Sequence, residues 1–568
     1  MTSSSVSFYS KLRTSLSVVI KHATKHTGVG LVCSVAYFDP GNWGVDLQAG
    51  SQFGYKLLFV VLVSGLFAVY MQVLSSRLGC VTGLDLATHC RLLLHDRPKH
   101  TLRWRWLVLY PLYVLAEVAI IATDLAELLG SAIALNLLFP KLPLWAGVLV
   151  TASDVLFLLA MRNPLGAQPV RMFEIIVAAL VFTVLICMAI IISRSGVHWG
   201  EAFFGFVPSK DVVSASGLYT SIGILGATVM PHSLFLGSAL STQERETSHE
   251  DQADESIESI ESISIAETKE DDSEDLTPAV PEQEVSRRCW TMNGVKRGTA
   301  KFLQSCFSVT KIAGPAGDAK NHTEWENHSW AFVHTHLYHG IVDMCISLIG
   351  IAVVINAMIL ILASATFYYG FGQTGNESPA TLFDAYDLLK QILGTPVATL
   401  FALALLASGQ SSSIIATLAG QTVSEGFINW HMSPIMRRLL TRCLGLIPSM
   451  VVAAGLGKPG ISALLVISQV VLSIVLPFVV YPLIYITSSK RFMSVKKPAV
   501  QNSDGEVSSV VFHPDQSSAA CVSDPKEAVE DTIDCSNGWI MMILGWIMWL
   551  IIVVANVYTI VTLGMGEE

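Results

Sequence analysis

Two short motifs place residues that could bind a metal ion beside residues that break helices. The first is DPGN at 39–42, and the second is MPH at 230–232. Asp39 offers a carboxylate, Asn42 a carbonyl oxygen and Met230 a thioether. A thioether beside oxygen ligands favours Mn, Fe, Co or Cd over Mg and Ca, which prefer oxygen alone. The pattern therefore predicts a site for a divalent transition-metal ion.

The elements that carry these motifs are transmembrane helices. The chain of 568 residues is 52% hydrophobic and only 14% charged, with a positive mean hydropathy, which excludes a soluble multidomain enzyme. A helix that crosses the membrane needs about 20 mostly apolar residues. Eleven segments qualify, and we expect helices at about 28–50, 56–78, 106–133, 144–161, 171–193, 214–240, 338–364, 396–421, 436–456, 461–487 and 538–564.

The loops between these helices differ in charge. Lys and Arg gather in alternate loops, which predicts a cytoplasmic N-terminus and an outer C-terminus. Two polar loops rich in Ser, Glu and Asp are expected to be disordered and to offer sites for trafficking or regulatory proteins. The expected segments are a cytoplasmic tail at 1–27, helices 1–6 at 28–240, an acidic cytoplasmic loop at 241–335, helices 7–10 at 336–487, a second cytoplasmic loop at 488–537, and helix 11 with the C-terminus at 538–568.

The two motifs fall in the first and the sixth expected helix, five helices apart. Proline removes a backbone donor and clashes with the preceding turn, and unwound backbone inside a membrane must line a cavity. Matching breaks point to an inverted repeat with the substrate site between them. The carbonyl near Ala227 is then free to face Asp39. Met230 could instead fill core space, but its place directly before Pro231 favours a ligand.

A second group of polar residues lies on the third and ninth expected helices. Asp124 and Glu127 are three residues apart, so both carboxylates share one helix face, next to Thr123. Arg437 and Arg438 begin the ninth helix and could pair with the carboxylates in a stepwise proton route. The arginines could equally be the basic flank of a cytoplasmic helix end, and this alternative stays open.

Three motifs together resemble a known family. DPGN at 39–42, MPH at 230–232 and GQSSSIIATLAGQ at 409–421 resemble the Nramp family of metal transporters, and its fungal branch in particular. The resemblance covers most of the chain outside the two loops. It implies an all-α integral membrane protein with a leucine-transporter-like fold, a 5+5 inverted repeat and an eleventh helix. It also implies symport of protons with manganese(II) or iron(II) by alternating access. The metal ligands that it implies are Asp39, Asn42, the Ala227 carbonyl and Met230.

Further positions acquire a role from the same resemblance. Gln469 resembles a family position that approaches the metal, although alone it would indicate helix packing. Asp124 and Glu127 match a polar pathway from the metal site to the cytoplasm. His232 is either a core histidine or a group that accepts protons near neutral pH, and its place at the break favours the second. Ser233 departs from the family, which more often has Asn there.

These residues suggest how metal and proton are coupled. A divalent ion that reaches Asp39 favours the charged carboxylate and displaces a proton. We expect this proton to leave through His232, or directly to Asp124 and Glu127, while the two broken helices open the inner path. This is a hypothesis from the sequence.

Other classes of protein fit less well. A sodium-coupled amino-acid carrier of the same fold has little use for Asp39 beside Met230. A sensor would signal through a folded effector domain, but both loops are short and low in complexity and show no such domain. The sequence contains no HExxH or GxSxG motif that would indicate an enzyme. It has no basic cluster that would indicate nucleic-acid binding, and its ten cysteines lack the spacing of disulfide frameworks or zinc sites. We expect no cofactor, and a plasma, endosomal or vacuolar membrane.

Overall fold

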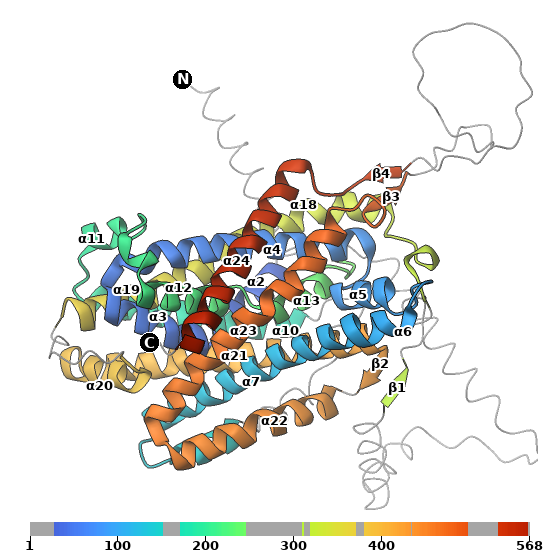
Figure 1. Cartoon of the computed structure of the whole chain (residues 1–568). Coiled ribbons are helices and arrows are strands. Elements are labelled where there is room, and N and C mark those ends of the chain that lie inside the picture. The colour runs from blue at the N-terminus through green and yellow to red at the C-terminus, as the bar shows by residue number, and fades with distance from the viewer. Residues whose placement is uncertain are drawn as a thin grey trace, which may run out of the picture.

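The computed structural model describes residues 28–151, 171–245, 309–311, 319–370, 380–432, 434–497 and 532–565. Its long helices lie side by side in one bundle (Figure 1). These helices are α2 (Val29–Ser34), η1 (Val35–Phe38), α3 (Pro40–Phe53), α4 (Leu58–Thr82), α7 (Tyr110–Leu138), α8 (Leu144–Thr151), α10 (Arg171–Arg194), α12 (Ala215–Thr228), α13 (Pro231–Leu240), α18 (Trp330–Ser347), η7 (Leu348–Val353), α19 (Val354–Ala363), η8 (Ser364–Tyr368), α21 (Thr395–Ile428), α22 (Pro434–Gly455), α23 (Gly457–Thr487) and α24 (Trp539–Met565).

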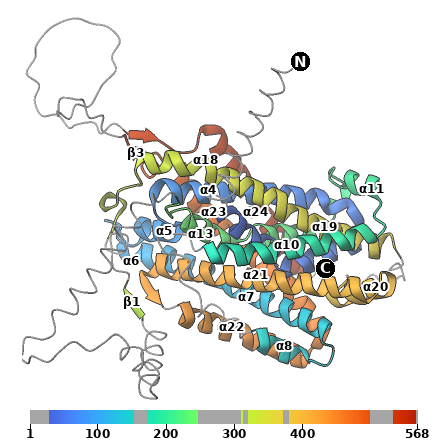
Figure 2. The same cartoon turned by 180° about the vertical axis from the view of Figure 1, so that it is seen from behind.

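Short elements mark the two ends of the bundle (Figures 1 and 2). What we call the strand end carries α5 (Leu86–Leu94), α6 (Thr101–Trp104), the π-helical turn η3 (Arg105–Leu109), η6 (His322–Glu324), β1 (Val309–Lys311), β2 (Trp430–Met432), β3 (Ser494–Lys496) and β4 (Thr532–Asp534). The strands form two antiparallel pairs, β1 with β2 and β3 with β4. The opposite end carries η2 (Gly54–Leu57), α11 (Trp199–Phe204), η5 (Lys210–Val213) and α20 (Leu382–Ile392).

The helices match the expected membrane crossings. Among the described residues, eight helical stretches are long and apolar enough to cross a membrane, and one of them, Pro40–Thr82, contains both α3 and α4. Two expected helices fall outside this count. Residues 152–161 of the fourth lie outside the described part, and α22 is apolar only over Cys443–Gly455. Each of the eleven expected helices therefore has a counterpart, which is the architecture of a multi-pass membrane protein.

The two expected loops differ from the prediction at their edges. Helix α18 begins at Trp330, eight residues before the expected start at 338, because Ser329 caps it by accepting a hydrogen bond from the Phe332 N–H. Residues 319–328 are also ordered by contacts with neighbouring helices. After the second loop, Asn537 returns to α23 and donates to the Thr487 hydroxyl at 2.9 Å. Residues 246–308, 312–318 and 498–531 lie outside the described part of the chain.

The first helix is broken at the DPGN motif. The turn η1 ends at Phe38, Asp39 has an extended backbone with ψ of 168°, and α3 begins at Pro40. Asp39 caps α3, because its Oδ1 accepts a hydrogen bond from the Asn42 N–H at 2.9 Å. Proline suits the first helical position, where a backbone donor would lack a partner. The motif thus ends one helix and starts the next.

The sixth helix is broken in the same way. Helix α12 ends at Thr228, Val229 departs from helical geometry with a ψ of 83°, Met230 is extended, and α13 begins at Pro231. The Met230 carbonyl accepts hydrogen bonds from the Ser233 N–H at 3.2 Å and the Ser233 hydroxyl at 2.8 Å. A proline again occupies the first position of the new helix.

The carbonyls released at the first break have donors from other helices. The Tyr37 carbonyl accepts from Asn356 Nδ2 at 2.7 Å. The Phe38 carbonyl accepts from the Ser408 hydroxyl at 2.6 Å and from Trp43 Nε1 at 3.2 Å. Because an unpaired carbonyl in a membrane interior costs several kcal/mol, these donors make the break tolerable.

Glycines on two other helices make room for Pro40. A Cβ at Gly130 of α7 would lie 2.0 Å from Pro40 Cβ, and a Cβ at Gly409 of α21 would lie 3.3 Å from Pro40 Cγ. The first distance leaves no room for a side chain at position 130. Close contacts with α7 and α21 therefore fix the position of the break between η1 and α3.

We expect Gly130→Ala to destabilise the protein by about 1–3 kcal/mol, because the added methyl group overpacks the contact with Pro40. The measurement is thermal unfolding of the purified protein in detergent. Gly350→Ala is the matched control, since a Cβ at Gly350 meets nothing within 4 Å. Equal unfolding temperatures for the two variants would show that the contact with Pro40 is not tight.

Candidate functional site

The two breaks meet at the side chain of Asn42. Its Nδ2 donates to Asp39 Oδ1 at 2.8 Å and to the Ala227 carbonyl at 2.9 Å. Asp39 and Ala227 are fully buried, and Asn42 is 1% exposed. The structure therefore brings together three residues that the sequence predicted as one site, although they come from two helices.

Gln469 reaches the same point from α23. A Cβ at Gly41 would lie 1.7 Å from Gln469 Nε2 and 3.1 Å from Asp39 Oδ2. The backbone carbonyl oxygen of Gln469 also lies close to Gly226, because a Cβ at Gly226 would be 2.6 Å from it. Gln469 is thus packed against both breaks. Met230 lies at the second break as the residue that precedes α13, and its side chain is fully buried.

Several buried oxygen atoms around this junction lack a hydrogen-bond partner in the described part of the chain. Asp39 Oδ2 and Gln469 Oε1 have no hydrogen-bond partner among the described residues. Buried acceptors without donors are rare and costly in a folded protein. A bound cation would satisfy both oxygen atoms, so the arrangement is suited to cation binding.

The available donor atoms are chemically mixed. No cluster of three or more His, Cys, Asp and Glu residues is found in the described part of the chain. The junction instead offers one carboxylate, amide and backbone carbonyl oxygens, and the nearby thioether of Met230. Such a set suits divalent ions of intermediate softness rather than Mg or Ca.

His232 contacts the third helix. Its Nδ1 lies 3.3 Å from the Thr123 hydroxyl oxygen, and this hydroxyl itself donates to the Ala119 carbonyl at 3.0 Å. Thr123 must therefore accept the hydrogen bond, which places the proton of a neutral His232 on Nδ1. Nε2 is then the nitrogen that can accept a further proton.

The two carboxylates predicted for the proton route are buried on the same helix, α7. Asp124 is 2% exposed and Glu127 is 1% exposed. Asp124 faces α22, because a Cβ at Gly445 would lie 3.3 Å from Asp124 Oδ2. Arg437 and Arg438 belong to α22, but their side chains lie outside the described residues. The structure thus places α7 against the helix that carries both arginines.

Ser233, the departure from the family pattern, belongs to a polar cluster below the second break. The Tyr37 and Ser233 hydroxyl oxygens are 2.9 Å apart, and the Tyr37 hydroxyl donates to Gln72 Oε1 at 3.1 Å. Gln72 Nε2 in turn donates to the Ser233 carbonyl at 3.3 Å. A serine therefore keeps this polar network connected.

Sequence reasoning missed three residues at the site. Asn356 and Ser408 supply donors to the first break, and Asp46 is a carboxylate at 2% exposure one turn beyond Asn42. Asn356 and Asp46 were detectable as polar residues inside apolar segments. Ser408 gave no such signal, because serine is common in transmembrane helices and its partner is a backbone carbonyl.

A protein-family model matches the chain over both breaks. The family model described as natural resistance-associated macrophage protein-like, Nramp, matches residues 30–267 and 319–503. This match covers more than half of the chain and includes both breaks, Asp124, Glu127 and Gln469.

Several relatives are similar over nearly the whole chain. The manganese transporter pdt1 of Schizosaccharomyces pombe is 39% identical over 96% of this chain and 87% of its own. The iron transporter SMF3 of Saccharomyces cerevisiae is 35% identical over 97% and 98%. A divalent metal cation transporter, MntH, of Listeria monocytogenes is 38% identical over 82% of each chain.

A solved structure supports the fold. The manganese transporter of Eremococcus coleocola, crystallised with an aromatic bis-isothiourea compound, is 27% identical with a TM-score of 0.63, over 93% of this chain and 84% of that one. The expected all-α, leucine-transporter-like fold with broken helices 1 and 6 is thereby confirmed. The relatives are named for metal transport and not for catalysis, so the chain is not an enzyme. Because the family model matches more than half of the chain and relatives above 30% identity cover nearly all of it, this chain belongs to the Nramp family of metal transporters.

Proposed function

We propose that this chain is a symporter that imports manganese(II) or iron(II) into the cytosol together with protons, by alternating access. The observation that carries the proposal is the pair of unpartnered oxygen atoms, Asp39 Oδ2 and Gln469 Oε1, at the junction of two broken helices. The metal ion is the substrate, and no cofactor is required.

The ligands in this proposal are Asp39, Asn42, the Ala227 carbonyl, Met230 and Gln469. One of them must turn. Asn42 now directs its Nδ2, and not its oxygen, toward Asp39 and Ala227. A rotation of this amide would release Asp39 Oδ1 and the Ala227 carbonyl and present Asn42 Oδ1 to the metal.

Met230 determines which metal ions are accepted. Oxygen ligands alone would bind Ca and Mg as well as Mn and Fe, whereas a thioether adds affinity only for the softer ions. The names of the relatives, manganese and iron transporters, agree with this selection.

The proton route in this proposal begins at Asp39. A divalent ion at Asp39 favours the ionised carboxylate and displaces its proton. His232 Nε2 is the next acceptor, and the contact between His232 and Thr123 leads to the neighbouring Asp124 on α7. From there Glu127 continues the route along α7, and Arg437 and Arg438 of α22 pair with the two carboxylates and stabilise their charged forms.

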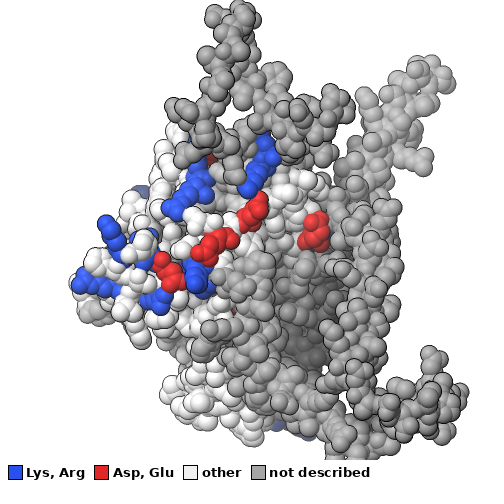
Figure 3. All heavy atoms as spheres, turned by 90° about the vertical axis from the view of Figure 1, so that its right-hand side faces the viewer, with Lys and Arg blue, Asp and Glu red and all other residues white. Residues whose placement is uncertain are grey.

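The charge distribution supports a cytoplasmic strand end, and therefore import. Figure 3 views this end and shows Lys and Arg gathered on it. Cytoplasmic ends of membrane proteins carry such an excess of basic residues. The exposed basic residues at this end are Lys99, Arg103, Lys320, Lys490, Arg491, Lys496 and Lys497. The N-terminal side of α2 is then cytoplasmic, in a plasma, endosomal or vacuolar membrane, with the polar loops open to regulatory proteins.

We expect Asp39→Asn to abolish uptake of manganese into proteoliposomes, because the amide cannot ionise and loses the charge that holds the cation. Uptake is measured with and without an inward proton gradient, and manganese binding by calorimetry on the purified protein. Asp387→Asn changes an exposed carboxylate on α20 and is the control. Parent-like binding and uptake by Asp39→Asn would exclude Asp39 as a ligand.

We expect Met230→Ala to reduce the preference for uptake of manganese over calcium by about tenfold, equivalent to about 1.4 kcal/mol. Only the softer ion loses a preferred ligand in this variant. The measurement is competition between the two ions for uptake. Met188→Ala removes another fully buried methionine, on α10, and should leave the ratio unchanged. An unchanged ratio in Met230→Ala would assign Met230 to packing.

We expect Asp124→Asn and Glu127→Gln to reduce the dependence of uptake on the proton gradient while manganese binding stays close to that of the parent. The reason is that both residues lie on the proposed proton route and not at the metal. Glu201→Gln, an exposed carboxylate on α11, serves as the control. Parent-like gradient dependence in both variants would remove α7 from the route.

A further inference from the structure

A short segment of the first long loop crosses the strand end of the bundle. We call residues 319–328 the strap. It supplies donors to the last turn of α4, where helix carbonyls lack intrahelical partners. His328 Nδ1 donates to the Cys80 carbonyl at 2.9 Å, the His328 N–H to the Val81 carbonyl at 3.2 Å, and Trp325 Nε1 to the Thr82 carbonyl at 2.7 Å. Three consecutive carbonyls of α4 are thus held by the strap.

The strap also binds α5. His322 Nε2 and His89 Nδ1 are 2.9 Å apart, and Arg91 Nη1 donates to the Ala319 carbonyl at 3.4 Å. Burial, together with the charge of Arg491, lowers the pKa of His322 to about 4. Burial and the nearby His322 lower the pKa of His89 as well, so both rings stay neutral near pH 7 and the contact does not depend on small changes in cytosolic pH.

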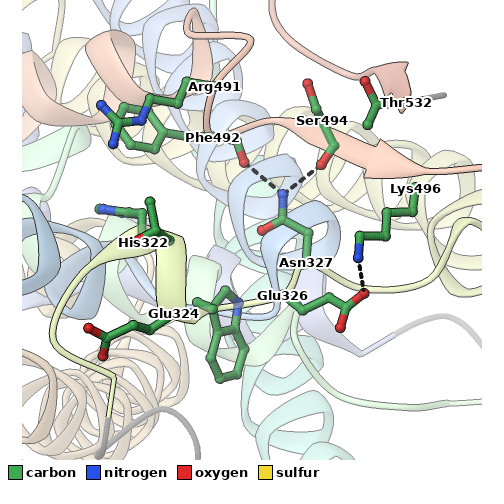
Figure 4. A pocket seen from close by; sticks show the side chains of 11 residues that line it. His322, Glu324, Glu326, Asn327, Arg491, Phe492, Ser494, Lys496 and Thr532 are labelled. Carbon is green, nitrogen blue, oxygen red and sulfur yellow. Dashed lines mark hydrogen bonds and ion pairs between the residues drawn. The ribbon is translucent and has the colours of Figure 1, made fainter. Parts of the chain in front are cut away.

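At its far end the strap is joined to the segment that follows α23 (Figure 4). Asn327 Nδ2 donates to the Phe492 carbonyl at 2.9 Å and to the Ser494 carbonyl at 2.8 Å. Glu326 and Lys496 add an exposed ion pair at 3.1 Å, which contributes little. A cavity of about 540 Å³ lies beside these contacts, lined by both the strap and this segment. The amide of Asn327 is therefore the principal bridge.

Helix α4, whose last turn the strap contacts, packs closely against α13, the second half of the broken sixth helix. A Cβ at Gly79 of α4 would lie 1.9 Å from the Ser238 carbonyl oxygen of α13, and a Cβ at Gly237 of α13 would lie 1.8 Å from Gln72 Nε2 of α4. Glycines at these contacts let α4 and α13 pack closely, which couples the positions of the two helices. Because α13 begins at the second break, a movement of α13 carries α4 and pulls on the strap.

We propose that the strap is a built-in restraint on the opening of the strand end. It ties the α4–α13 pair to the segment after α23, so these two parts cannot separate until the bonds of Asn327 and Trp325 are broken. The proposal rests on the proposed alternating access, because only that mechanism requires the strand end to open. It gives the first long loop a direct mechanical link to the transport cycle.

The test measures how often the strand end opens. Cys33 on α2 is fully buried, whereas Cys443 on α22 is exposed. The purified full-length protein in nanodiscs is treated with a thiol reagent, and labelling of each cysteine is followed by mass spectrometry of its peptide. In Asn327→Ala we expect Cys33 to react about fivefold faster than in the parent, as the loss of neutral hydrogen bonds implies, with Cys443 unchanged.

Two further variants keep the result interpretable. Trp325→Phe retains the ring and removes only the donor to Thr82, so it should also accelerate Cys33 labelling. Asn136→Ala is the matched control, because Asn136 donates to the Leu142 carbonyl at 2.7 Å away from the strand end. Parent-like labelling of Cys33 in both strap variants would overturn the restraint.

Manganese binding, measured on the same samples, tests the proposed function separately. Cys33 labelling needs no metal, so loss of the proposed function would appear as absent binding in the parent. Failure of the restraint would appear as normal binding with unchanged labelling.

Discussion

Backbone groups released inside a membrane find no water, and the centre of this protein is organised around that fact. At the first break the donors come from three helices: Asn356 from α19, Ser408 from α21 and Trp43 from α3. At the second break, Asn42 of α3 donates to the Ala227 carbonyl. The breaks are therefore stable only in the assembled bundle. Since the same unwound turns supply the oxygen atoms of the candidate site, the stability of the breaks and the geometry of that site depend on one set of contacts.

Asp39 shows how closely the two tasks are joined. Its Oδ1 caps α3 by accepting from the Asn42 N–H, and its Oδ2 remains without a donor. One carboxylate thus starts a helix with one oxygen and faces the junction with the other. Substitutions at this position consequently change the helix start as well as the charge, which is why isosteric Asn is a sharper probe than Ala.

Much of this arrangement was predictable, because it follows from local chemistry. Pro40 and Pro231 stand beside further helix-disfavouring or polar residues in two matching apolar spans, so the breaks could be located, whereas Pro448, Pro477 and Pro482 lie inside continuous helices. Contacts between segments that are distant in the sequence could not be predicted. The direction of the Asn42 amide depends on where Ala227 lies, and the donors Asn356 and Ser408 depend on helix packing. The strap was expected to be disordered because its residues are polar, yet its order comes from carbonyls at the end of α4.

Helix α21 differs from the broken helices in running for 34 residues. At about 1.5 Å per residue it is about 51 Å long, whereas the hydrocarbon core is about 30 Å thick. Tilt alone would have to reach about 54° to hide it, beyond the range of about 0–40° found for such helices. Helix α21 must therefore project from the lipid. Its last turn, where the Gly426 carbonyl accepts from Arg91 Nε at 3.0 Å, is held to α5 at the strand end.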